Sequence, residues 1–176
     1  PAADSYVTRG QTGTDSVLVQ MRVTNAGDTV AAITGSALSF WRAGVNVTGN
    51  FSVVAAAANP DSIPANSSET LSFRVSVAAG AGTGYTDIRG YVTGYDTRFL
   101  TAIANGSDSD GIGNGDTSFF VVQTPAALSV IRITAYGDTV SRGQTGGDSV
   151  RVTMTVQNSG EAAAVNLLDT LTCWRG

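Results

Sequence analysis

The sequence predicts an all-β protein built as an antiparallel β-sandwich, and two observations carry this prediction. Hydrophobic and polar residues alternate along short segments such as residues 17–23 and 71–77, and a period of two indicates a sheet with one buried face. Clusters of Gly, Pro, Asn and Asp separate these segments at regular intervals, which is typical of short strands in a sandwich. No segment has the pattern of a three-turn helix.

The individual strands follow from these two signals. Besides the two segments above, we expect strands at residues 37–42, 45–54, 86–95, 117–123, 128–135 and 150–156. Turn-forming residues cluster between them, and we expect loops at residues 25–28, 59–61, 79–84 and 105–116.

A long internal repeat defines the domain organisation. The stretch from Arg9 to Arg42 matches the stretch from Arg142 to Arg175 without a gap, at a constant offset of 133 residues and with about half of the positions identical. A period of this length corresponds to a whole domain. We therefore expect a tandem repeat: residues 1–124 form one copy that lacks an evident first strand, and residues 125–176 form the opening strands of a second, incomplete copy. Residues 124–127, which contain Pro125, mark the boundary.

The uneven copies have two interpretations. The chain is part of a longer array of repeats, or the missing strands come from a neighbouring subunit. An incomplete sandwich leaves strand edges open, and an open edge can accept an added strand. Both interpretations remain open at this point, and they are compatible with each other.

The composition excludes several classes of function. The chain has ten positive charges, all arginine, no histidine and a net charge of −4, which argues against nucleic acid as a partner. Without Lys or His the usual bases for a Ser or Cys nucleophile are absent, and no pair of carboxylates stands out for glycoside hydrolysis. With one cysteine, zinc, copper and iron sites are not expected. We therefore expect no enzyme, and no run of about 20 apolar residues predicts a membrane span.

Calcium is the one metal that the sequence suggests. Residues 105–116 alternate Asp and Asn with glycines, and Asp108, Asp110, Asn114 and Asp116 are the candidate ligands. Hard cations bind several oxygens from a tightly curled loop, and glycine permits that curl. The alternative is a solvated hairpin loop of ordinary turn-forming residues. No other cofactor is expected.

Four triplets match the acceptor pattern for N-glycosylation, at Asn46, Asn50, Asn66 and Asn105. Such triplets also arise by chance in a chain rich in Asn, Ser and Thr.

The two tryptophans occupy equivalent positions in the two copies. Trp41 and Trp174 are expected in the structural core, as core aromatics are in comparable sandwiches; the alternative is a sugar-binding platform. Cys173 aligns with Phe40 and is expected to be a small core residue.

The motif Arg9-Gly-Gln-Thr-Gly, the alternating segment 17–23 and the turn Thr24-Asn-Ala-Gly resemble bacterial and archaeal extracellular immunoglobulin-like repeats, of which the CARDB type (cell-adhesion-related domains) is the nearest likeness. Residues 63–70 before Leu71 are also similar to this family. The resemblance implies an immunoglobulin-like sandwich, an extracellular or cell-surface location and neighbouring repeats as partners. It brings no catalytic residues.

The expected function is therefore a structural or adhesive repeat of an extracellular fibre, stalk or surface-layer protein. One version of this expectation has the repeat completed by strand exchange with a neighbouring subunit. The alternative is a module of a larger secreted protein or enzyme that binds carbohydrate or another cell-surface ligand.

Overall fold

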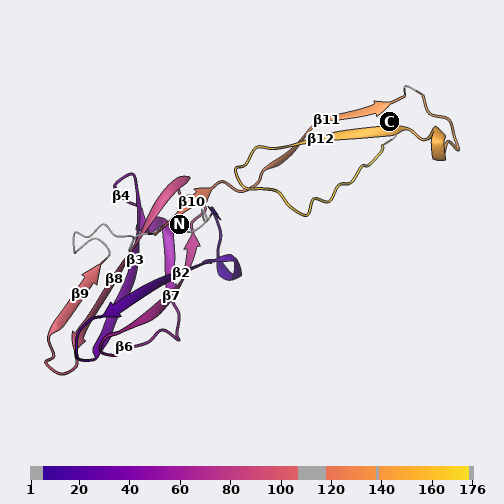
Figure 1. Cartoon of the computed structure of the whole chain (residues 1–176). Coiled ribbons are helices and arrows are strands. Elements are labelled where there is room, and N and C mark those ends of the chain that lie inside the picture. The colour runs from indigo at the N-terminus through magenta and orange to yellow at the C-terminus, as the bar shows by residue number, and fades with distance from the viewer. Residues whose placement is uncertain (1–5, 107–117, 138, 175–176) are drawn as a thin grey trace. The chain divides into compact units, whose positions relative to one another are not determined.

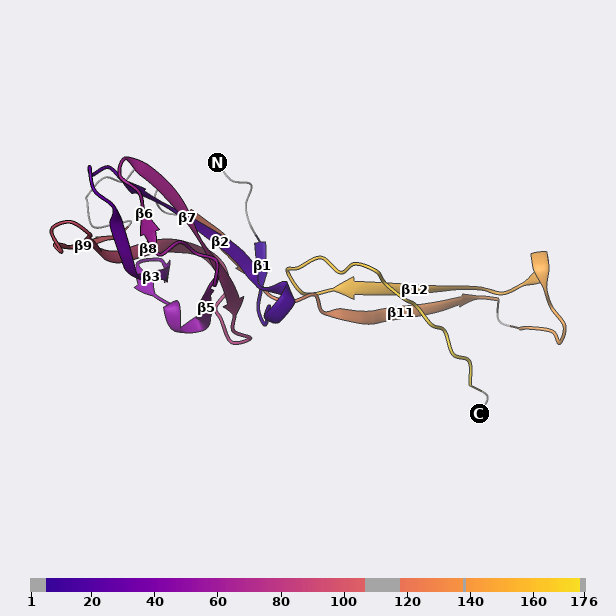
Figure 2. The ribbon, with the colours of Figure 1, turned by 90° about the horizontal axis from the view of Figure 1, so that it is seen from below.

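The computed structural model describes residues 6–106, 118–137 and 139–174. The chain divides into two compact units, Pro1–Gln123 and Thr124–Gly176, and each is treated by itself below. Both units consist of β-strands joined by loops and three short 3₁₀ turns, Gly13–Asp15, Thr48–Asn50 and Gly146–Asp148 (Figures 1 and 2). The all-β prediction is confirmed.

The larger sheet of the first unit contains seven strands. Five of them lie in the order β1 (Tyr6–Thr8), β10 (Ser118–Gln123), β8 (Gly84–Asp96), β3 (Ala31–Arg42) and β4 (Val45–Asn46). Two short strands complete the sheet: β6 (Ser62–Ile63) pairs with β3, and β9 (Ala102–Gly106) pairs with β8. All pairs are antiparallel except β1 with β10, which is parallel.

The smaller sheet of the first unit contains three antiparallel strands. They lie in the order β2 (Val17–Asn25), β7 (Ser67–Val77) and β5 (Phe51–Ala55). Apolar and polar residues alternate strictly in the second half of β7, and this explains its burial pattern. Leu71, Phe73, Val75 and Val77 are all at most 1% exposed, while the intervening residues face away from the core. β7 is therefore the central strand of this sheet, both in its pairing and in its burial.

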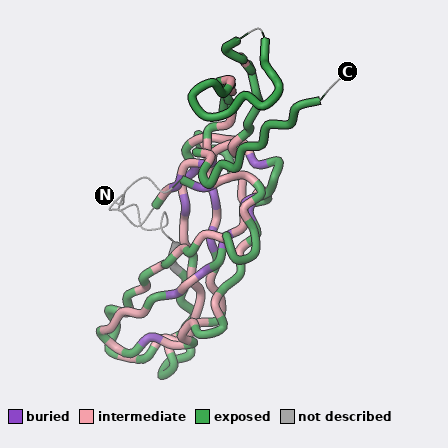
Figure 3. Tube along the Cα trace, turned by 90° about the vertical axis from the view of Figure 1, so that its right-hand side faces the viewer, coloured by how far each residue is buried: buried purple, intermediate pink, exposed green. Residues whose placement is uncertain are grey.

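The core of the first unit lies between the two sheets. Three aromatic rings meet there from three strands: Phe40 from β3, Phe51 from β5 and Phe120 from β10, with ring centroids 4.3 to 5.8 Å apart. Val7 and Val122 belong to the same cluster of buried side chains. Figure 3 shows the buried residues on the strands that enclose this cluster.

The second unit is a hairpin of two strands, β11 (Leu128–Tyr136) and β12 (Arg151–Asn158). The register shifts between Val130 and Arg132, which is a β-bulge. None of the residues described in this unit is buried, as the predominantly exposed hairpin in Figure 3 shows. Two strands alone do not enclose a core.

Most of the expected strands are present, and the differences have local causes. The segment expected at residues 45–54 is divided into β4 and β5 by the 3₁₀ turn Thr48–Asn50. Three short strands, β1, β6 and β9, were not predicted, and the end of β9 falls within the loop expected at residues 105–116. Within the described ranges, no helix has the length and apolar character needed to cross a membrane.

Candidate functional site

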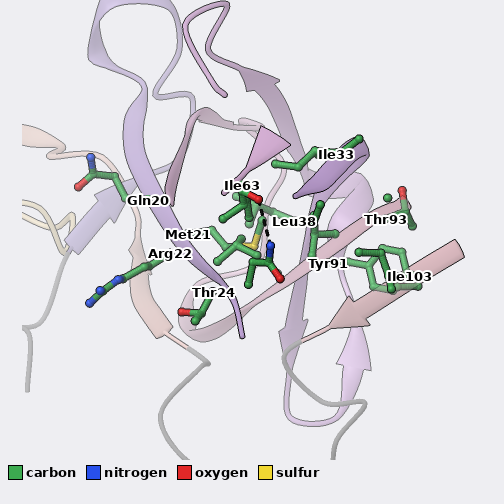
Figure 4. A pocket seen from close by; sticks show the side chains of 18 of the residues that line it. Gln20, Met21, Arg22, Thr24, Ile33, Leu38, Ile63, Tyr91, Thr93 and Ile103 are labelled. Atoms are coloured by element: carbon green, nitrogen blue, oxygen red, sulfur yellow. Dashed lines mark hydrogen bonds between the residues drawn. The ribbon is translucent and has the colours of Figure 1, made fainter. Parts of the chain in front are cut away.

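A groove of about 790 Å³ opens beside β2 in the first unit (Figure 4). Its walls come from β2 on one sheet and from β3, β6, β8 and β9 on the other side. Val19, Met21 and Val23 of β2 line it, and Figure 4 shows Met21 pointing inward while Gln20 and Arg22 point away.

The position of β2 in its sheet explains the groove. β2 pairs with β7 on one edge, and no strand of the described chain pairs with its other edge. The inward residues of β2 are consequently only partly buried, whereas those of β7 are almost fully buried. The groove therefore combines an open hydrogen-bonding edge with incompletely covered apolar side chains.

Small residues on the facing sheet give the groove its depth. Ala31, Ala32 and Gly90 line it opposite β2. A Cβ atom on Gly90 would lie 2.2 Å from the Sδ atom of Met21, closer than any normal contact. The glycine thus leaves the space that the methionine side chain occupies.

Asn25 closes one end of the groove with a set of hydrogen bonds. Its Nδ2 donates to the carbonyl oxygens of Thr29 at 2.7 Å, Ile63 at 3.0 Å and Pro64 at 3.1 Å, and its Oδ1 accepts the N–H of Gly27 at 3.0 Å. The bond to Ile63 is drawn in Figure 4. One amide side chain therefore joins the end of β2, the following turn and β6.

The repeated motif contains a turn organised by a glutamine. Oε1 of Gln11 accepts the N–H of Thr8 at 2.9 Å, and its Nε2 donates to the carbonyl of Asp15. In the second unit Oε1 of Gln144 accepts the N–H of Ser141 at 2.9 Å, and its Nε2 donates to the carbonyl of Asp148. The same bonds are thus formed at an offset of 133 residues.

The backbone of the two turns agrees as well. Gly10 and Gly143 have φ values of 77° and 83°, and Gly13 and Gly146 have 60° and 61°. Such positive values favour glycine, which explains why both glycines are present in both copies.

The predicted core residues Trp41 and Trp174 are not among the buried residues that the structure describes. Phe40 is fully buried opposite Ile88, whereas Trp41 is opposite Asp87 on the other face of the sheet and only partly buried. Successive residues of a strand point to opposite faces, so a core Phe40 excludes a core Trp41. Trp174 is 90% exposed because its unit contains only a two-stranded hairpin. Cys173 is also exposed.

The outer face of the larger sheet carries aromatic and charged side chains. The guanidinium of Arg89 lies 4.5 Å from the ring centroid of Trp41, and Tyr85 stacks on Phe119 at 4.3 Å. Tyr91 and Tyr95 are 46% and 37% exposed on the same strand, β8. The sequence analysis singled out Trp41 but not Arg89, whose contact with Trp41 depends on the pairing of β3 with β8.

Arg42 ends β3 close to the core. Its Nη2 donates to Oγ1 of Thr86 at 3.0 Å, and Thr86 is fully buried. Burial lowers the pKa of the Arg42 guanidinium, and the nearby positive charge of Arg9 lowers it further.

The four candidate calcium ligands, Asp108, Asp110, Asn114 and Asp116, lie outside the described residues. In the part of the chain that the structure describes, no three carboxylate, thiol or imidazole groups are arranged to hold a metal ion.

Three glycosylation candidates can be placed. Asn46 on β4 is exposed, and its Oδ1 accepts the N–H of Thr48 within the same triplet at 2.9 Å. Asn66 is exposed with a φ of 51°, and Asn50 is partly buried at the end of a 3₁₀ turn. Asn105 lies in β9, and its side chain is outside the described set.

Comparisons with known proteins find no match. No protein-family model, no curated protein and no solved structure is similar to this chain at a significant level.

Proposed function

We propose that the chain is a structural or adhesive repeat of an extracellular fibre, stalk or surface-layer protein. The observation that carries this proposal is the repeated motif, whose glutamine-centred turn has the same hydrogen bonds and the same backbone angles in both units. Two copies of one folded element in one chain support a modular protein in which each copy has the same mechanical role.

An immunoglobulin-like assignment is part of the proposal, and strand order supports it. The sheet order β2-β7-β5 corresponds to strands B, E and D of that fold. The path β10-β8-β3-β4 corresponds to G, F, C and an additional C′ strand. The resemblance of the motif to CARDB-type domains points to the same assignment and to the cell surface.

Localisation on source cells tests this function. Gold-labelled antibodies against the first unit should decorate the cell surface, or filaments that extend from it, in electron micrographs. Label confined to the cytoplasm would contradict an extracellular role.

A second candidate function is favoured by the outer face of the larger sheet. The exposed rings of Tyr91 and Tyr95 on β8 are a surface on which a sugar ring can stack. A glycan array probed with the intact chain separates the candidates, because a spacer binds no glycan. If binding occurs, Tyr91→Ala should weaken it, and Tyr136→Ala, which changes an exposed tyrosine of the second unit, is the matched control.

Calcium binding at residues 108–116 remains a proposal with a simple test. If the site exists, adding EDTA should lower the melting temperature of the chain, and Asp110→Asn should remove that dependence.

A further inference from the structure

We propose that the groove beside β2 receives strand β11 of a second copy of the chain, which adds to the free edge of β2 as an antiparallel strand. This inference rests on the proposed function, because it describes how one repeat would engage the next molecule in an assembly. Three observations carry it: the register in the second unit, the side chains that this register presents and the length of the connection between the units.

The second unit shows the register. β12 is the sequence counterpart of β2, and β11 pairs with β12 in an antiparallel ladder in which Val130 faces Val156, Ile133 faces Met154 and Ala135 faces Val152. Residues of β12 correspond to residues of β2 that are 133 positions earlier. If β11 paired with β2 in the same register, Val130 would lie opposite Val23, Ile133 opposite Met21 and Ala135 opposite Val19.

This register presents apolar side chains to the groove. Residues directly opposite each other in a ladder point to the same face of the sheet. Val130, Ile133 and Ala135 would therefore point to the side on which Val19 and Met21 line the opening. The bulge at residues 130–132 adds one residue and increases the local twist. β11 thus fits both the open edge and the uncovered apolar surface.

Exchange preserves the hydrogen bonds and increases burial. β11 already forms a ladder with β12, so a move to β2 replaces one ladder by an equivalent one. In the hairpin Val130 and Ile133 remain 53% and 56% exposed, because no second sheet covers them. In the groove a facing sheet would cover them, and removal of apolar surface from water is the driving force.

The connection between the units excludes exchange within one molecule. β10 ends at Gln123, whose carbonyl accepts the N–H of Arg9, and the next residue, Gly10, donates its N–H to the carbonyl of Val77. Val77 is two residues from Val75, which pairs with Val17. Gln123 therefore lies at the same end of the sandwich as Val17. In the proposed register Leu128 would lie opposite Asn25, at the other end of β2. Eight strand residues span about 26 Å, whereas five residues of extended chain reach at most about 18 Å. β11 of the same molecule therefore cannot reach this register, and the proposed donor is β11 of a second copy.

Cysteine cross-linking tests the register. All variants carry Cys173→Ser, and one chain with Met21→Cys is mixed with an isotopically labelled chain that carries Ile133→Cys. Treatment with a short bis-maleimide, which forms a thioether with each cysteine, should give a covalent heterodimer of the expected mass. The matched control is Gln20→Cys, which lies one residue away on the opposite face of β2 and should not cross-link.

The outcomes are distinct. Cross-linking of Met21→Cys but not of Gln20→Cys supports the proposal. Equal cross-linking of both variants, or none while circular dichroism shows folded chains, overturns it. The pair Val23→Cys and Val130→Cys repeats the test if Met21→Cys does not fold.

Hydrogen exchange provides a second readout. A synthetic peptide of residues 126–137 added to the intact chain should slow amide exchange along β2, whereas a peptide of the same composition in scrambled order should not. If β2 is already protected in a monomeric chain without peptide, the groove is filled from within and the proposal fails. That result would leave the proposed function unaffected, because surface labelling in electron micrographs does not depend on strand exchange.

Discussion

Phe40 and Phe51 stack across the interior of the first unit with ring centroids 4.3 Å apart and an interplanar angle of 26°. Phe40 belongs to β3 of the larger sheet and Phe51 to β5 of the smaller one. Since Phe40 is fully buried, this pair is a direct link between the two sheets.

Removing this link should strongly destabilise the first unit. We expect Phe40→Ala to lower the free energy of unfolding by about 3–5 kcal/mol, because the change loses buried apolar surface and leaves a cavity. Urea unfolding followed by Trp41 fluorescence, in a Trp174→Phe background, measures the change. Phe99→Ala is the control: Phe99 is 68% exposed, so its loss should change the stability by at most about 0.5 kcal/mol.

The glutamine-centred turn should contribute to each unit separately. Gln11→Ala removes two hydrogen bonds to the backbone and should cost about 1–2 kcal/mol. Gln144→Ala should leave the unfolding of the first unit unchanged, since its bonds lie within the second unit. The same fluorescence assay compares the two variants, and an equal loss of stability would refute a local role for Gln11.

Gly94 should not tolerate a side chain. A Cβ atom there would lie 2.1 Å from the carbonyl oxygen of Ala32, beside the register shift between Ile33 and Gly35. Backbone has to move to relieve such a contact, so we expect Gly94→Ala to cost about 1–3 kcal/mol in urea unfolding. Gly49→Ala meets no atom within 4 Å and should be close to neutral.

Asp96 should make the first unit sensitive to acid. Oγ1 of Thr29 donates to Oδ2 of Asp96, and the backbone N–H groups of Phe99 and Arg98 donate to Oδ1 at 3.0 and 2.7 Å. These bonds, that from Thr29 above all, lower the pKa of the Asp96 carboxyl below its ordinary value.

The sign of the pH effect follows from this lowered pKa. The stabilisation is fully present above the pKa of about 3.9 that Asp has in an unfolded chain, and it is lost as the pH falls through the lower folded value. Asp96→Asn should therefore flatten the fall in melting temperature below pH 4, and Asp61→Asn should not. Parallel curves for Asp96→Asn and the wild type would contradict this prediction.

The strands that sequence alone predicts well are those with long alternation. β2 and β7 each have four hydrophobic residues at a period of two and β12 has three, and their positions agree with the prediction to within a few residues. β1 and β6 contain only three and two residues, and each is defined by pairing with a distant strand. Local pattern carries no information about such pairing.

The site was less predictable than the fold. The repeat drew attention to Trp41, but alternation in β3 assigns the core position to Phe40, one residue earlier. A shift of one residue moves a side chain to the opposite face of a sheet. The groove depends on which edge of β2 lacks a neighbour, and only the pairing of β2 with β7 shows this.

The pairing of β8 shows where this domain can accept new sequence. β9 pairs with residues 91–95 of β8, and β10 pairs with residues 84–88 along the same edge. β9 and β10 are thus two segments of one interrupted strand along β8, and β8 fixes the register of each. In a family of such repeats we expect lengths to diverge here first, and a foreign epitope grafted at this point should leave both sheets intact.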